Sequence, residues 1–248
     1  KEIGLIQRQS GRIWVDYMGG EVEESLIDIG ELNLFYKITM CGIAGIYSNK
    51  PVAAELYDSL IHLQHRGQDA AGIITYKNRM HKSKGSGLVK DIFTDKKIAR
   101  LKGNIGIAHN RYPTHGGFGH GEIQPFWTSV PYGIALAHNG NLTNANMLRS
   151  ELEAYGSIFQ SDSDSEVIVH LMAHSKEETC LSRVIEALTL VRGAYSLVFL
   201  TEREVIAARD PYGFRPLSLG RYKDAWIVAS ETCAFDIIGA KFVRDVEN

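Results

Sequence analysis

The chain has 248 residues, of which 44% are hydrophobic and 23% are charged. This composition is close to the average for globular proteins, and the length allows one large domain, or one domain with an appendage. The formal net charge is −2 and the Lys and Arg residues form no block, which argues against a nucleic-acid or anionic-membrane surface and favours small-molecule chemistry.

Three cysteines lie far apart, at Cys41, Cys180 and Cys233. This spacing argues against a disulfide framework and a Cys-x-x-Cys metal site, so we expect a reducing compartment, with the cytoplasm as the default. No apolar run approaches the roughly 20 residues that span a bilayer.

The first forty residues differ from the rest, and we predict a boundary at Met40. Residues 1–40 carry seven acidic and four basic side chains, and they lack the apolar core of a signal peptide. We expect them to be a leader, which is either a cleaved propeptide or sequence upstream of a start codon at Met40. Residues 41–248 are expected to form the folded domain.

A helix is predicted over residues 52–65, because Val52, Leu56, Leu60 and Leu63 share one of its faces. Strand-like apolar runs then alternate with loops rich in Gly, Pro and Asn. These runs occupy residues 70–76, 103–109 and 132–138.

Helices are predicted next, the first of them ending at Gly156. Ser163 with Glu166, and Ser175 with Glu178, have the spacing of capping boxes and predict two further helix starts. Strand-like runs follow at residues 194–201, 204–210, 216–220 and 225–231. Strands, then helices, then strands predict an α+β domain in which two antiparallel sheets stack together with helices on their outer faces.

Cys41 is the first candidate functional residue, at the head of the apolar run "CGIAGIY". A small thiol at the start of a strand is often a core residue. As a nucleophile it would need activation, because a free cysteine with a pKa near ~8.5 is mostly protonated at neutral pH. If Cys41 becomes the first residue of the mature chain, its own α-amine can act as the base.

Three further positions fit a site that cleaves an amide. Asn139 and Gly140 can supply donors for an oxyanion, although Asn-Gly is also a strong hairpin-turn signal. Arg111 lies at a strand end before a glycine-rich loop and suits a carboxylate ligand, or it is simply a surface residue.

Asp164 at a helix start either complements the helix dipole or holds a cationic amine. Arg111 and Asp164 together would bind the two charged ends of a free amino acid. Glu166, His170 and His174 recur every four residues, but the His-Glu-x-x-His pattern is absent and we predict no metal site.

Several motifs in order resemble one family. "CGIAGIY" resembles the mature start of class II glutamine amidotransferases, which are N-terminal-nucleophile hydrolases. "LQHRGQDAAGI", "HNRYPT", "LAHNGNLTNA", "SDSDSE", "RDPYGFRPL" and "ASETCAFD" are similar to the glutaminase domain of the amidophosphoribosyltransferases. The similarity covers essentially all of residues 41–248.

The resemblance implies a four-layer αββα sandwich with Cys41 as the nucleophile. It implies that Asn139 and Gly140 form the oxyanion hole, and that Asp164 anchors the amino group of L-glutamine. The remaining family positions fall on Arg111 and Thr114, which bind the glutamine carboxylate, and on Arg66 and Gly67, in a loop beside the nucleophile.

The family continues into a phosphoribosyltransferase domain, which this sequence lacks. The resemblance implies that such a domain of the full-length protein is the partner, that the protein forms a homo-oligomer, and that Mg²⁺ and, in some members, an iron–sulfur cluster belong to the missing part. No cofactor is expected in residues 41–248. The alternatives are an amidotransferase for hexosamine phosphate or asparagine synthesis, and a silent glutamine-binding domain.

Overall fold

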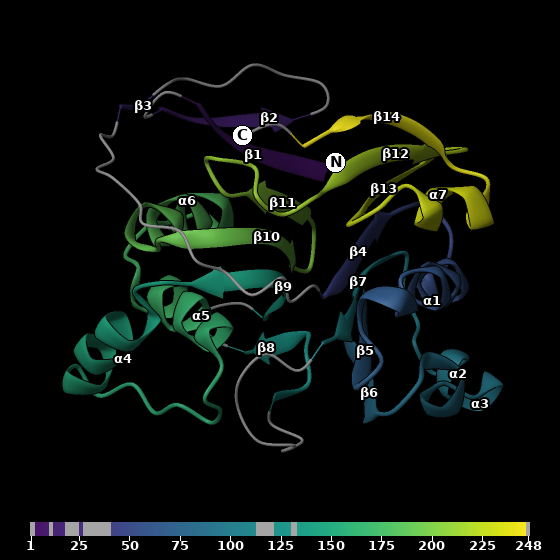
Figure 1. Cartoon of the computed structure of the whole chain (residues 1–248), viewed down its shortest axis with the longest axis horizontal. Coiled ribbons are helices and arrows are strands. Elements are labelled where there is room, and N and C mark those ends of the chain that lie inside the picture. Colours follow the sequence, from purple (N-terminus) through teal and green to yellow (C-terminus); the bar gives the residue numbers. More distant parts are fainter. Residues whose placement is uncertain are drawn as a thin grey trace.

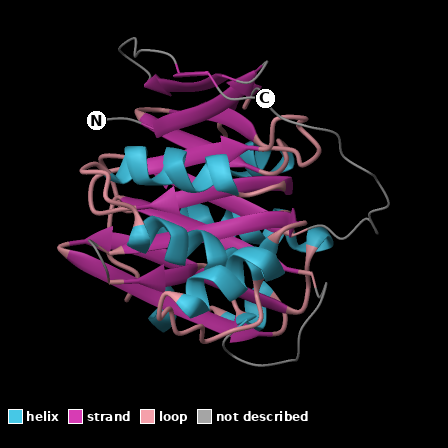
Figure 2. Cartoon of the chain, turned by 90° about the vertical axis from the view of Figure 1, so that its left-hand side faces the viewer, coloured by secondary structure: helices cyan, strands magenta, loops and turns pink. Residues whose placement is uncertain are grey.

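Two seven-stranded sheets stack face to face in the computed structural model of the protein, and helices cover the outer face of each sheet (Figure 1). The structure describes residues 3–9, 12–17, 25–26, 41–112, 122–129 and 133–246. Viewed from the side, helices lie in front of the strands (Figure 2). The predicted α+β four-layer sandwich is therefore confirmed.

The first sheet has the order β3-β2-β1-β11-β10-β9-β8. Pairing within it is antiparallel, except that β1 runs parallel to β11. Its strands are β1 (Ile3–Gln9), β2 (Arg12–Tyr17), β3 (Ser25–Leu26), β8 (Phe126–Thr128), β9 (Ile134–Leu142), β10 (Gly193–Leu200) and β11 (Val205–Arg209).

The second sheet has the order β14-β12-β13-β4-β7-β5-β6 and is antiparallel throughout. The strand that follows Cys41 lies at its centre. Its strands are β4 (Gly42–Tyr47), β5 (Ala70–Lys77), β6 (Arg79–Ser86), β7 (Ile105–Arg111), β12 (Ser218–Tyr222), β13 (Ala225–Ala229) and β14 (Lys241–Asp245).

The helices divide between the two outer faces (Figure 1). Three cover the first sheet: α4 (Ala145–Ala154), α5 (Asp164–His174) and α6 (Cys180–Leu190). The second sheet carries α1 (Ala53–His62), the 3₁₀ helix η1 (Gln64–Arg66), α2 (Val89–Ile92), α3 (Asp95–Ile98) and α7 (Cys233–Ile238).

Three layers of apolar side chains hold the sandwich together. In β10, Leu197 and Phe199 pack against the helices, whereas Val198 and Leu200 face the other sheet. In β4, Ile43 lies between the sheets and Ile46 lies beneath α1. Both faces of these strands are buried, which explains why the sequence shows continuous apolar runs there.

Some local predictions need correction. Ser175 does not begin a helix, because it is the C-cap of α5; the hydroxyl of Thr179 caps α6 by accepting the N–H of Ser182. The polar strand β6 was not predicted, since its apolar content is low and its pairing with β5 defines it.

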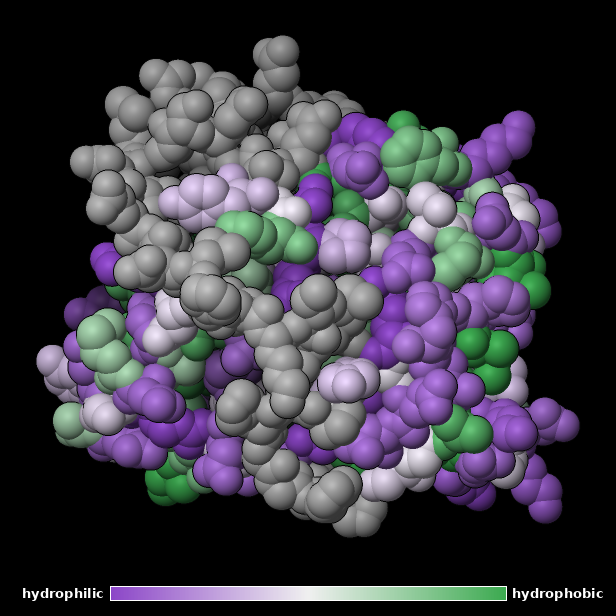
Figure 3. All heavy atoms as spheres, in the orientation of Figure 1, coloured by the Kyte–Doolittle hydropathy of each residue, from purple (hydrophilic) through white to green (hydrophobic). Residues whose placement is uncertain are grey.

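The described surface on the face in Figure 3 is mostly hydrophilic, with apolar residues in small separate groups. No helix in the described part of the chain is long and apolar enough to cross a membrane.

Candidate active site

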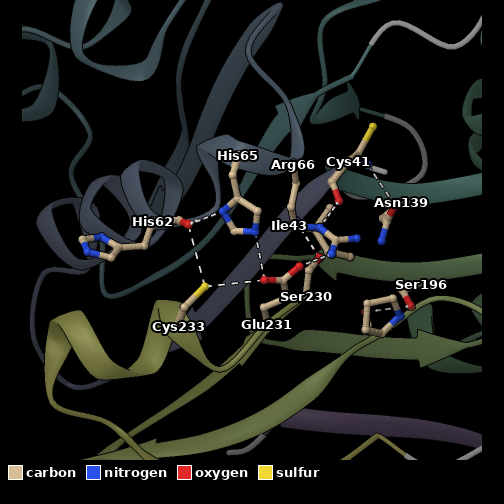
Figure 4. Close-up of polar contacts among 11 residues, drawn as sticks. Cys41, Ile43, His62, His65, Arg66, Asn139, Ser196, Ser230, Glu231 and Cys233 are labelled. Carbon is tan, nitrogen blue, oxygen red and sulfur yellow. Dashed lines mark hydrogen bonds and ion pairs between the residues drawn. The ribbon is translucent and has the colours of Figure 1, made fainter. Parts of the chain in front are cut away.

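Cys41 directly precedes the central strand β4, and three contacts hold its backbone and sulfur. Its N–H donates to Oδ1 of Asn139 at 3.1 Å, and its carbonyl accepts from Nε of Arg66 at 2.8 Å. The N–H of Tyr112 lies 3.5 Å from its Sγ. The thiol is therefore fixed at the end of a buried strand (Figure 4).

The surroundings of the thiol keep it protonated. Burial raises the pKa of Cys41, while the N–H of Tyr112 and the positive charges of Arg111 and Arg66 act in the opposite direction without overcoming it. A thiol with a raised pKa needs a base to become a nucleophile at neutral pH.

A cavity of about 280 Å³ opens beside Cys41. Four of the predicted site residues line it, namely Cys41, Arg111, Gly140 and Asp164. They come from four separate places in the chain: the start of β4, the end of β7, the strand β9 and the start of α5. The fold therefore brings together residues that the sequence spaces more than 120 positions apart.

Arg111 is the last residue of β7 and is 8% exposed. Its Nη1 lies 3.5 Å from Oδ2 of Asp69. The guanidinium is permanently charged and keeps further donors in its planar fork. It can therefore bind a carboxylate inside the cavity. The alternative that Arg111 is simply a surface residue is wrong, because the residue is buried.

Asp164 supplies the opposite charge. Its Oδ2 accepts the N–H of Leu142 at 2.8 Å, its Oδ1 accepts the hydroxyl of Ser165 at 3.2 Å, and Nδ1 of His138 lies 3.6 Å away. Burial by itself would raise the pKa of Asp164, but His138 and these hydrogen bonds hold it below its usual range. An ionised carboxylate thus faces the same cavity as Arg111.

Asn139 and Gly140 lie inside β9, so the hairpin-turn alternative is wrong. Asn139 is fully buried, and its Nδ2 has no hydrogen-bond partner among the described residues. Gly140 has φ +154°, and a Cβ there would lie 2.1 Å from the carbonyl oxygen of Ala194. Only glycine fits this backbone, and a free amide donor lies next to it.

Arg66 and Gly67 lie behind the cavity and do not line it. The Arg66 side chain is 1% exposed, and its Nη1 pairs with Glu231 (Figure 4). At Gly67 a Cβ would come within 2.5 Å of the carbonyl of Arg111. This glycine lets the loop lie against the segment that contacts Cys41. Thr114 lies outside the described residues.

Comparisons with known proteins identify the family of this domain. A family model described as "Glutamine amidotransferase domain" matches residues 117–236. Amidophosphoribosyltransferase of Bacillus subtilis is 44% identical over 210 residues, 84% of this chain and 44% of that protein. The chain contains a class II glutamine amidotransferase domain. It is homologous to the N-terminal region of amidophosphoribosyltransferases.

Other relatives of the amidotransferase domain support the same family. Amidophosphoribosyltransferase 3, chloroplastic, of Arabidopsis thaliana is 47% identical over 209 residues, 83% of this chain and 39% of that protein. The solved structure of glutamine phosphoribosylpyrophosphate amidotransferase from B. subtilis, complexed with ADP and GMP, has a TM-score of 0.79 and 42% identity, covering 84% of this chain and 45% of that one. The chain thus spans less than half the length of these relatives.

Sequence reasoning missed the residues that support the amidotransferase site. Glu231 pairs with Arg66 across 165 positions. Oε1 of Gln124 accepts the N–H of His138, and Ser165 bonds both Gln124 and His138. The motifs "ASETCAFD" and "SDSDSE" contain Glu231 and Ser165, but no spacing in the sequence indicates what these residues contact.

Glu166 organises the loop that precedes Asp164. Its carboxylate accepts the N–H groups of Gln160 and Ser161 at 2.8 Å each, and not that of Ser163. Ser163 does cap the helix, but its hydroxyl accepts the N–H of Ser165 and not that of Glu166, so the predicted reciprocal capping box does not form. His174 bonds Ser157 at 2.8 Å and so points away from Glu166. This helix face therefore shows no metal-ligand arrangement among its described contacts.

Replacing Glu166 by Gln should make stability less dependent on pH. Burial by itself would raise the pKa of Glu166, but hydrogen bonds from His170, Ser161 and Gln160 lower it to about 2. The stability that the ionised Glu166 adds to the wild type is therefore present above pH 4.5 and is lost as the pH falls towards 2. Urea unfolding should show a difference of about 2 kcal/mol at pH 7, after allowance for solvent screening.

The matched control is Glu153→Gln, since Glu153 is exposed on α4. It should change the free energy of unfolding by less than about 0.5 kcal/mol at every pH. A wild-type advantage over Glu166→Gln that stays constant from pH 7 to pH 2 would contradict the assignment.

Proposed function

We propose that this domain hydrolyses L-glutamine to glutamate and ammonia, with Cys41 as the nucleophile. The observation that carries the proposal is the cavity that a thiol, a guanidinium and an ionised carboxylate share. A free amino acid has one negative and one positive end. Arg111 and Asp164 can bind these two ends while the side-chain amide of the substrate reaches Cys41.

The base is the α-amine of Cys41, once that residue is the first of the mature chain. The amine takes the thiol proton, and Sγ attacks the carbonyl carbon of the glutamine side chain. Nδ2 of Asn139 and the N–H of Gly140 donate to the resulting oxyanion. The amine returns the proton to the leaving nitrogen, ammonia departs, and water hydrolyses the γ-glutamyl thioester to glutamate.

The other predicted residues keep this arrangement in place. Arg66 holds the carbonyl of Cys41 at 2.8 Å, and Gly67 lets the backbone of Arg111 and Tyr112 approach. Thr114 assists Arg111 with the glutamine carboxylate in this proposal. A reducing compartment such as the cytoplasm suits the mechanism, because it keeps the nucleophilic thiol free.

The acceptor proposed for the ammonia is phosphoribosyl pyrophosphate. The relatives are named amidophosphoribosyltransferases, and this chain spans less than half their length. A phosphoribosyltransferase domain of the full-length protein would form 5-phosphoribosylamine, the committing step of purine synthesis. Mg²⁺, any iron–sulfur cluster and homo-oligomer contacts belong to that part. Hexosamine phosphate and asparagine synthesis are the alternative acceptor chemistries.

A silent glutamine-binding domain is the rival function, and one observation favours it for the uncleaved chain. The nitrogen of Cys41 is there an amide that donates to Asn139, and an amide nitrogen cannot act as a base. We expect the active species to begin at Cys41, as measured by intact-mass spectrometry of protein that turns over glutamine. An active preparation with residues 1–40 still joined to Cys41 would exclude the amine mechanism.

Replacing Cys41 by Ala should abolish glutaminase activity and leave glutamine binding measurable, because the charged groups that bind the substrate are elsewhere. Ammonia release measures the glutaminase activity, and calorimetry measures glutamine binding. Cys180→Ala is the matched control, since it removes another free thiol. Wild-type turnover in Cys41→Ala would refute the assignment of Cys41 as the nucleophile. Loss of glutamine binding in Cys41→Ala would refute the proposal that Arg111 and Asp164 bind the substrate without help from the thiol.

Arg111→Ala and Asp164→Asn should each weaken glutamine binding by about 2–5 kcal/mol, since each removes one partner of a desolvated charge pair. Calorimetry in a Cys41→Ala background measures binding without turnover. Arg203→Ala, with an 82% exposed side chain, should leave the affinity unchanged. Equal affinity before and after either test substitution would remove that residue from the site.

A further inference from the structure

A second cluster of chemically versatile side chains lies where η1 meets α7, on the outer face of the second sheet. His65 of η1, Glu231 after β13 and Cys233 at the start of α7 each place one potential ligand atom within 4.8 Å of the others. It is the one such group in the ranges that the structure describes. Figure 4 shows the three side chains converging.

The spacing of Oε2 and Sγ fits two ligands of a tetrahedral ion, whereas Nε2 lies closer to Oε2 than two ligands of one ion do. Oε2 of Glu231 lies 2.9 Å from Nε2 of His65 and 3.7 Å from Sγ of Cys233. Zinc–ligand bonds of usual length place an N and an O ligand about 3.4 Å apart, and an S and an O ligand about 3.6 Å apart. The His65 side chain is 55% exposed, so it has room to move away from Oε2 when an ion binds.

The contacts of His65 leave one ring nitrogen facing the carboxylate of Glu231. Its Nδ1 lies 2.9 Å from the carbonyl oxygen of His62, which can only accept, so Nδ1 carries a hydrogen. Its Nε2 faces the carboxylate of Glu231, which also only accepts. With Nδ1 occupied by its bond to His62, Nε2 is the ring nitrogen placed to ligate a metal beside Oε2 of Glu231.

Cys233 adds a third potential ligand to the same point. Its Sγ lies 3.7 Å from both the Glu231 carboxylate and the carbonyl of His62, so its one hydrogen cannot satisfy both. In known metal sites a ligating histidine donates its other N–H to a carbonyl or carboxylate, which fixes the ring. The bond from His65 to His62 is of this kind.

We propose that His65, Glu231 and Cys233 bind a divalent transition-metal ion of the zinc class, with water as the fourth ligand. Imidazole, thiolate and carboxylate together suit zinc and not the harder magnesium. On binding, Cys233 releases its thiol proton to solvent, because the thiolate is the form that ligates a metal. Oε1 of Glu231 keeps its contact with Arg66, so the carboxylate bridges two cations.

The test is a titration of the metal-free protein with Co²⁺, in a Cys41→Ser background that removes the other thiol near this region. We expect a thiolate-to-cobalt charge-transfer band in the near ultraviolet and the visible bands of tetrahedral Co²⁺. Zn²⁺ should displace the Co²⁺ and abolish both. Absence of the charge-transfer band at saturating Co²⁺ would overturn the proposal.

Single variants assign the ligands. Cys233→Ser should remove the charge-transfer band, and His65→Ala should weaken Zn²⁺ binding at least ~100-fold, since even losing an outer partner costs about 10–100-fold. Cys180→Ser should behave like its parent. Because His65 is exposed, its variant is expected to fold, which circular dichroism checks. Undiminished bands in Cys233→Ser, or equal Zn²⁺ affinity in His65→Ala and its parent, would overturn the site.

Discussion

The pairing of the buried Arg66 guanidinium is the interaction on which the rest of the site depends. A permanently charged group with a 1% exposed side chain needs partners, because an unpaired buried charge is very costly. Glu231 supplies the counter-charge and the carbonyl of Cys41 accepts from Nε. The same contacts fix the backbone of Cys41 and the position of Glu231.

The sandwich makes this arrangement possible. The central strands β4 and β7 are buried on both faces, so their ends are held by packing as well as by hydrogen bonds. Cys41 and Arg111 lie at adjacent ends of these two strands, and Asp164 opens the helix that covers the other sheet. Opposite charges thus face one cavity without neutralising each other, which is what a zwitterionic ligand requires.

Glu231 connects the two regions of interest. One carboxylate oxygen contacts Arg66 and the other contacts His65 and approaches Cys233. The proposed ion and the proposed nucleophile are therefore separated by two side chains. Glu231 of the outer cluster thus contacts Arg66, the group that holds the carbonyl of Cys41.

The sequence by itself determined the layered fold and most of the site candidates. Short apolar runs such as 194–201 predicted buried strands, and the order of motifs from "CGIAGIY" to "ASETCAFD" indicated the family. These signals are local, because burial of each face of a strand fixes residue types two positions apart. The same locality explains why the polar strand β6 escaped prediction.

Only the tertiary structure decided which candidates meet. Asn139 and Gly140 read locally as a turn, yet pairing of β9 with β10 extends the strand through them. His65 and Glu231 are 166 positions apart, and their contact follows from the packing of α1 and η1 beside α7. Contacts at such separations depend on strand register and layer packing, which no spacing within one sequence encodes.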